Sequence, residues 1–214
     1  MMRKYILMDL DGTVTDSSLG IINSTLHALK RLGIEEHDRE KLKAFIGPPL
    51  HESFMKFYGM TEAEGFDAVE KYREYYRERG IFENLVYDGI PEFLKAAKDA
   101  GCTLILATSK PEVFAKQILA HFHIDGYFDY CVGSELDGTR VKKDEVITCA
   151  MEKAGIMDVN DAVMIGDREH DVIGAHKCNM KAIGVLYGFG DLAEMEACGA
   201  DQIAATPADL IGLI

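Results

Sequence analysis

Short apolar runs recur at the start of the chain and through its second half, and each is apolar throughout rather than alternating. Such runs are typical of strands buried on both faces of a parallel sheet. The three clearest end at polar or small residues: Asp9, Thr108 and Gly166 follow them directly. The runs cover residues 5–8, 103–107, 162–165 and 182–186, with a weaker one at 130–133.

Amphipathic segments with helical spacing lie between these runs, at residues 90–100, 111–122, 143–154 and 171–177. Gly101 is suited to end the first of them, and Pro111 to begin the second. Strands that alternate with helices predict a doubly wound, Rossmann-like α/β fold with a parallel sheet. We assign residues 1–14 and 85–214 to this core.

Residues 15–84 have a different pattern, because helical spacing dominates and no convincing strand is present. The expected helices cover 21–32, 38–45, 50–57 and 61–79, with breaks at glycine or proline. A segment of this length is too long for an ordinary βα loop. We therefore predict an inserted all-helical cap that closes over a site in the core and excludes water.

The composition limits which classes of binding partner and which cellular compartment are expected. The chain has 36 acidic and 23 basic residues, a formal charge of −13, which disfavours nucleic-acid polymers and anionic membranes as partners. Five scattered cysteines and no long apolar run are typical of a cytoplasmic protein. We expect the binding partner to be a small anionic metabolite. We expect the protein itself to be a monomer or a small homo-oligomer.

The first polar group follows the first strand. In open α/β sheets, ligands bind beyond the carboxyl ends of the strands. Asp9 and Asp11 stand there, and Gly12 lets the backbone turn tightly and approach a ligand. An ordinary Asp-Gly turn is the simpler interpretation. Two close carboxylates after a buried strand are costly without a cation, however, and this favours a functional site.

The last polar group contains Asp167, which ends its strand, and Asp171, which lies four residues later, about one helical turn on, and is expected to face the same way. Together with Asp9 they form an oxygen-rich set of the kind that suits Mg²⁺. A helix N-cap at Asp167 followed by an acidic first turn would explain the same pattern without a metal.

Phosphate-binding groups are expected between the two acidic groups. Thr108 and Ser109 precede a helix whose first amides are free to bind an anion, and Lys142 or Lys143 would add a positive charge. The segment 188–190 superficially suggests a dinucleotide-binding loop, but it lacks the third glycine and the early βαβ context.

With these motifs in order, the whole chain resembles the haloacid dehalogenase superfamily of phosphohydrolases, in its branch of phosphoglycolate phosphatases and 5'-nucleotidases with a helical cap. The resemblance rests on Asp9-x-Asp11-Gly12-Thr13, on Thr108, on a lysine, and on Gly166-Asp167-x-x-x-Asp171.

The resemblance implies a role for each matching residue. Asp9 would be the nucleophile that forms an aspartyl-phosphate, and Asp11 the general acid and base. Mg²⁺ would be held by Asp9, the backbone carbonyl of Asp11, Asp167 and Asp171. Thr108 and the lysine would bind the phosphoryl oxygens.

Two departures from the family pattern leave choices open. Relatives often continue the lysine motif with Pro-x-Pro, which is missing here, and we favour Lys143 over Lys142 because it stands at the start of a helix. His170 occupies a position where Asn or Asp is common, so it either supports the site or lies exposed on a helix.

The expected activity is hydrolysis of a small phosphomonoester, with phosphoglycolate or a nucleoside 5'-monophosphate as the candidate substrate. A sugar phosphomutase of the β-phosphoglucomutase type would share the same motifs. A non-catalytic regulatory or binding module is a further alternative, although such a protein has no reason to keep mutually repulsive carboxylates. A dehalogenase would not need the paired aspartates or a magnesium site.

Overall fold

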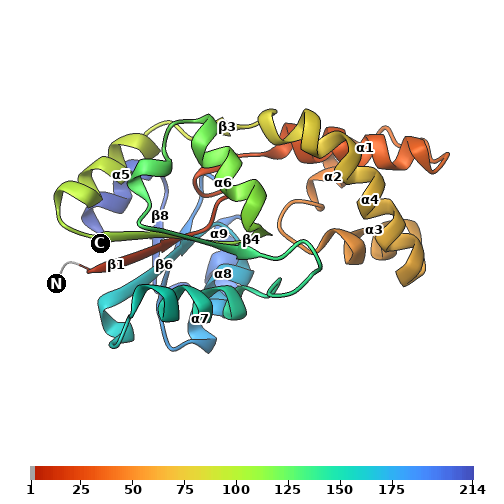
Figure 1. The fold of residues 1–214 in the computed structure, drawn as a ribbon. Helices are drawn as coiled ribbons and strands as arrows, with labels where there is room; N and C mark the ends of the chain where they lie inside the picture. The colour runs from red at the N-terminus through yellow and green to blue at the C-terminus, as the bar shows by residue number, and fades with distance from the viewer. Residues whose placement is uncertain (1–2) are drawn as a thin grey trace. The chain divides into compact units, whose positions relative to one another are not determined.

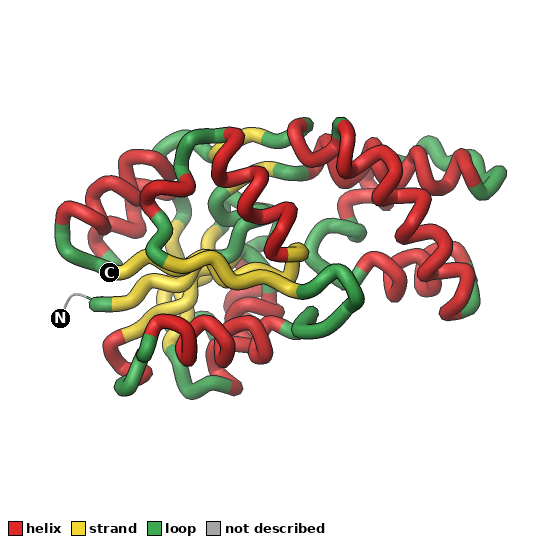
Figure 2. Tube along the Cα trace, in the orientation of Figure 1, coloured by secondary structure: helices red, strands yellow, loops and turns green. Residues whose placement is uncertain are grey.

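A computed structural model describes residues 3–214 and separates them into two compact units (Figures 1 and 2). The first unit contains the N-terminal segment up to Thr15 together with Val86–Ile214, and the second contains Asp16–Leu85. Within the described residues, no helix is long and apolar enough to cross a membrane.

A six-stranded sheet forms the centre of the first unit, and every neighbouring pair of its strands is parallel. The strand order is β5-β4-β1-β6-β7-β8, so the first strand lies in the middle. In the register, Leu7 pairs with Ile105 on one side and with Met164 on the other. The strands are β1 (Tyr5–Met8), β4 (Thr103–Pro111), β5 (Tyr130–Ser134), β6 (Ala162–Gly166), β7 (Lys181–Val185) and β8 (Gln202–Ala204).

Helices cover both faces of this sheet, with α5 and α6 on one face and α7 and α8 on the other (Figure 1). Val146 of α7 and Val172 of α8 join Leu7 and Ile105 in one buried cluster, because alternate strand residues point to this face. The predicted α/β fold with a parallel sheet is thereby confirmed. The helices are α5 (Ile90–Asp99), α6 (Glu112–His121), α7 (Lys143–Ala154), α8 (Glu169–Lys177) and α9 (Leu192–Cys198), with short 3-10 turns η2 (Asp125–Tyr127), η3 (Val159–Asp161) and η4 (Pro207–Gly212).

The second unit is a helical bundle in which α4 packs against both α1 and α3. Its longest helix, α4, starts with a capping box between Thr61 and Glu64. Phe45 and Phe54 meet edge to face in its core, with ring centroids 5.0 Å apart. The helices are α1 (Ser18–Arg31), α2 (Arg39–Lys43), α3 (Leu50–Tyr58) and α4 (Glu62–Glu78), followed by the 3-10 turn η1 (Gly80–Phe82). A role for this unit as a cap stays a prediction.

The chain passes between the units through two short strands, β2 (Thr15–Asp16) and β3 (Leu85–Val86), which pair with each other in a separate sheet. The sequence pattern did not predict this pair, because two residues are too few to establish any periodicity.

Other differences from the predicted elements occur where polar residues or short lengths hide the pattern. Strand β4 continues four residues beyond its apolar run, and Pro111 ends this strand instead of opening the first turn of α6. Helix α9 and strand β8 were not predicted at all. Each has few buried residues, so the hydrophobic signal is weak.

Candidate active site

The tight turn after β1 holds the first two candidate residues, Asp9 and Asp11. Gly12 has φ +84, and its N–H donates to the carbonyl oxygen of Thr15 at 2.8 Å. A Cβ atom at Gly12 would stand 2.0 Å from Oδ2 of Asp167. This position therefore requires glycine both for its positive φ and for the close approach of Asp167.

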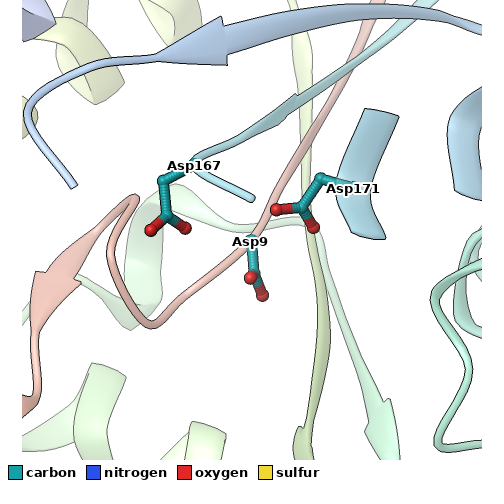
Figure 3. A group of neighbouring side chains, drawn as sticks. All are labelled: Asp9, Asp167 and Asp171. Carbon is teal, nitrogen blue, oxygen red and sulfur yellow. The ribbon is translucent and has the colours of Figure 1, made fainter. Parts of the chain in front are cut away.

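Three carboxylates meet at the carboxyl ends of β1 and β6: Asp9, Asp167 and Asp171 (Figure 3). One oxygen from each lies within 4.8 Å of the others, and the Asp167 and Asp171 side chains are buried. Asp9 follows β1, Asp167 follows β6, and Asp171 belongs to α8. The sheet topology therefore brings together residues separated by more than 150 positions.

Both carboxylate oxygens of Asp167 are fixed by hydrogen bonds. Thr13 Oγ1 donates to Oδ1 at 3.2 Å, and the backbone N–H of Phe189 donates to Oδ2 at 2.8 Å. A Cβ atom at Gly188 would stand 2.4 Å from Cβ of Asp167, and one at Gly190 would stand 2.0 Å from its carbonyl oxygen. The two glycines of the apparent dinucleotide loop thus allow the backbone to pass beside Asp167 and hold it.

Asp171 joins the cluster from the first turn of α8. Helix α8 begins at Glu169 with Arg168 as its N-cap, so Asp167 precedes the helix and is not its N-cap, which was the alternative interpretation of the sequence. Asp171 is the third helical residue and accepts a hydrogen bond from the N–H of Arg168 at 3.2 Å. A Cβ atom at Gly166 would stand 2.2 Å from its carboxyl carbon, so only glycine leaves room there.

A buried lysine joins two of these carboxylates. Lys143 Nζ lies 2.8 Å from Oδ1 of Asp9 and 2.8 Å from Oδ1 of Asp171, and it donates to the carbonyl oxygen of Ala107 at 3.2 Å. Burial alone would lower the pKa of Lys143, but the negative charges of Asp171 and Asp9 outweigh it, so its pKa is raised. Lys142, the sequence alternative, is the exposed N-cap residue of α7.

Asp11 has a lysine of its own. Lys110 Nζ lies 2.9 Å from Oδ1 of Asp11, and both side chains are largely buried. Thr108 is buried beside this pair and accepts a hydrogen bond from the N–H of Lys110 at 3.2 Å, while Ser109 between them is half-buried. Lys110 was not among the site residues predicted from the sequence. Its position two residues after Thr108, at the same strand end, could have indicated that it belongs to the site.

The charges of the site do not balance. Burial raises the pKa of Asp167 well above its usual value, and the charges of Asp171 and Asp9 raise it further. Burial also raises the pKa of Asp171 to about 6, although Lys143 opposes the shift. Four carboxylates and two ammonium groups leave two negative charges when all are ionised.

The donor set fits a hard divalent cation. The buried Oδ1 atoms of Asp9 and Asp171 accept no hydrogen bond of regular geometry from residues 3–214, although the Lys143 ammonium lies close to both. Carboxylate oxygens within a few ångströms of each other are the ligands that such a cation prefers, and its charge would cancel the excess.

The remaining predicted residue is His170. It is the second residue of α8, and its side chain is exposed to solvent. Of the two interpretations left open by the sequence, the structure favours the exposed helix residue.

Comparison with known proteins decides the family. The model of the haloacid dehalogenase-like hydrolases matches residues 6–185. The chain belongs to this family. A 5'-nucleotidase of Pseudomonas aeruginosa is 50% identical over 192 residues, which cover 90% of this chain and 86% of that protein. A crystal structure of a predicted phosphatase from Clostridium acetobutylicum, 47% identical, superposes with a TM-score of 0.95 and covers 100% of this chain and 98% of its own.

Another similar protein has a different activity in its name. The tyrosine-protein kinase PtkA of Mycobacterium tuberculosis is 36% identical over 205 residues, which cover 95% of this chain and 69% of the kinase. Membership of the family and the phosphatase relatives make this haloacid dehalogenase-like protein a phosphoric monoester hydrolase. The family resemblance and enzyme class expected from the sequence are confirmed.

Proposed function

We propose that this protein is a Mg²⁺-dependent phosphatase that hydrolyses small phosphomonoesters through an aspartyl-phosphate on Asp9. The observation that carries the proposal is the cluster of Asp9, Asp167 and Asp171 with Lys143 placed between two of them. A site with only a structural role would gain nothing from three carboxylates whose oxygens lie within 4.8 Å of one another, because their repulsion costs stability.

Two chemical steps follow from this assignment. In the first, a carboxylate oxygen of Asp9 bonds to phosphorus while the bond from phosphorus to the leaving oxygen breaks, and Asp11 gives its proton to that oxygen. In the second, Asp11 takes a proton from water as the water oxygen attacks phosphorus. The bond to Asp9 then breaks, and inorganic phosphate leaves.

The other residues have electrostatic and binding roles in the proposal. Asp9, Asp167, Asp171 and the backbone carbonyl of Asp11 would hold Mg²⁺. The ion supplies positive charge that offsets the repulsion between carboxylate and phosphate. Lys143 is already fixed between two carboxylates, and it would neutralise a phosphoryl oxygen. Thr108, Ser109 and the turn at Gly12 would donate hydrogen bonds to the same group.

A nucleoside 5'-monophosphate is the first substrate to test. The support is the 50% identity to the Pseudomonas aeruginosa 5'-nucleotidase, against 28% to a phosphoglycolate phosphatase of Aquifex aeolicus. We also propose a cytoplasmic location, supported by five cysteines that are all free thiols.

A second candidate function is phosphoryl transfer to an acceptor other than water. The similarity to a tyrosine kinase over 95% of this chain favours it, because an aspartyl-phosphate can react with any hydroxyl group placed in line. Sugar phosphomutases would use the same step.

The proposal is tested with a panel of nucleoside monophosphates, phosphoglycolate and sugar phosphates. Free phosphate should appear in equal amount to the substrate consumed, should require Mg²⁺, and should fall below detection in Asp9→Asn. Turnover that survives EDTA or the Asp9→Asn change would refute the mechanism. Consumption of substrate without free phosphate would favour the transfer reaction instead.

A further inference from the structure

The ion pair between Lys110 and Asp11 is separate from the one formed by Lys143. Lys143 forms ion pairs with Asp9 and Asp171, whereas Lys110 forms one with Asp11. Lys143 therefore belongs to the cluster of Asp9, Asp167 and Asp171 that could hold a metal ion, whereas Lys110 holds Asp11.

The backbone of β4 places Lys110 for this contact. The register between β4 and β5 shifts between Ala107 and Pro111, a bulge of the kind that re-aims side chains beside active sites. A Cβ atom at Gly133 of β5 would stand 2.5 Å from the carbonyl oxygen of Lys110, so only glycine allows the strands to approach here. Thr108 Oγ1 then fixes the N–H of Lys110 at 3.2 Å.

The ammonium group occupies one particular oxygen of Asp11. Oδ1 is buried and lies 2.9 Å from Lys110 Nζ, and it accepts no hydrogen bond of regular geometry from the described residues. A proton carried by this carboxyl group would therefore reside on Oδ2. Proton transfer requires a donor within about 2.6–3.2 Å of the acceptor, so a freely rotating carboxyl group would be a poor acid.

We infer that Lys110 is a positioning residue for Asp11: it binds Oδ1 and thereby directs the protonated Oδ2 toward the leaving oxygen of the phosphoester. The inference rests on the proposed function, since it assigns Asp11 as the acid. The inference concerns the orientation of the Asp11 carboxyl group. Lys110 would not contact the phosphoryl group itself, and its effect should depend on how much the leaving group needs a proton.

Two aryl esters of similar shape measure this dependence. Phenyl phosphate releases a phenol that requires protonation, whereas p-nitrophenyl phosphate releases a stable anion that does not. In Lys110→Met, kcat/KM for phenyl phosphate should fall at least about tenfold more than for p-nitrophenyl phosphate, since general acids contribute about 10²–10⁴-fold. Equal losses on the two esters, or no loss on either, would overturn the inference.

Further variants separate positioning from folding. Lys110→Arg keeps the charge and the donors and should preserve the ratio of the two esters. On an Asp11→Asn background, Lys110→Met should cause no additional selective loss. Lys116→Met breaks an exposed ion pair with Glu112 and should change neither rate. If Lys110→Met is not recovered folded, Lys110→Gln is assayed with the same two esters and judged by the same ratio.

The outcomes also distinguish this inference from the proposed function. A wild-type protein that hydrolyses neither ester nor any member of the substrate panel refutes the proposed function itself. A wild-type protein that hydrolyses both, together with a variant that loses both to the same extent, refutes only the assignment of Lys110.

Discussion

Replacing Asp167 by Asn should stabilise the metal-free protein while removing its response to Mg²⁺. The Asp167 side chain is fully buried, and burial is the largest cause of its raised pKa. An asparagine can still accept the hydrogen bond from the N–H of Phe189, and its amide can face the Thr13 hydroxyl. The substitution thus removes a buried charge and keeps the packing.

The magnitude follows from the spacing of the cluster. Two charges within 4.8 Å of each other repel by at least about 3.5 kcal/mol at an effective dielectric constant of about 20. Asp167 has two such neighbours, but protonation and solvent relaxation absorb most of the sum. We expect a net gain of about 2 kcal/mol at neutral pH, which corresponds to a rise in Tm of roughly 4–8 °C for a protein of this size.

The assay is thermal unfolding in EDTA and in Mg²⁺ across a range of pH. A carboxyl group whose pKa is higher in the folded state stabilises the fold at low pH, and this contribution is lost as pH rises through the raised pKa. Asparagine does not titrate. The advantage of Asp167→Asn in EDTA should therefore be small near pH 4 and should grow toward neutral pH.

Magnesium should reverse the order of stability, because an ion that binds only the folded state raises Tm. Wild type should gain several degrees and Asp167→Asn much less. Asp144→Asn, which removes a partly exposed partner of Lys177, is the matched control and should change little. An Asp167→Asn variant less stable than wild type in EDTA at neutral pH, or an equal magnesium response in both, would refute the reasoning.

Three further substitutions test other parts of the structure. Lys143→Met leaves the buried Asp171 and the largely buried Asp9 without their ammonium group. It should lower the unfolding free energy by about 3–5 kcal/mol in EDTA, measured by urea denaturation, with a smaller loss in Mg²⁺. Gly188→Ala would bring a methyl group within 2.2 Å of the carbonyl oxygen of Gly12, so calorimetry should show at least tenfold weaker binding of Mg²⁺. Gly20→Ala would meet the carbonyl oxygen of Gly80 at 1.9 Å and should destabilise the helical unit by about 1–3 kcal/mol, seen as faster proteolysis within Asp16–Leu85.

The sequence was sufficient for the inner strands β1, β6 and β7 of the sheet because nearly all of their residues are buried. Apolar runs such as 5–8 and 162–165 have no other simple interpretation when polar residues end them. The end of β4 is different: Thr108–Pro111 is polar, and its pairing with β5 depends on a bulge and on the space beside Gly133. Local periodicity carries no information about either.

The candidate site was predictable to the extent that it follows from strand ends. Asp9 and Asp167 come directly after neighbouring strands of the sheet, so topology alone brings them together. The pairing of Lys110 with Asp11 was not predictable, because it joins two strands across the sheet through one side chain. The glycines at 188 and 190 were visible in the sequence, but only their contacts with Asp167 show what they do.

The paired strands β2 and β3 also bear on how such a protein can evolve. Neighbouring strands lie about 4.8 Å apart, so the two ends of the Asp16–Leu85 segment leave the sheet unit side by side. When the two ends of an inserted segment lie side by side, the length of the insert can change with little effect on the domain that carries it. Selection can therefore enlarge, shrink or exchange the helices while the strand-end carboxylates keep their positions.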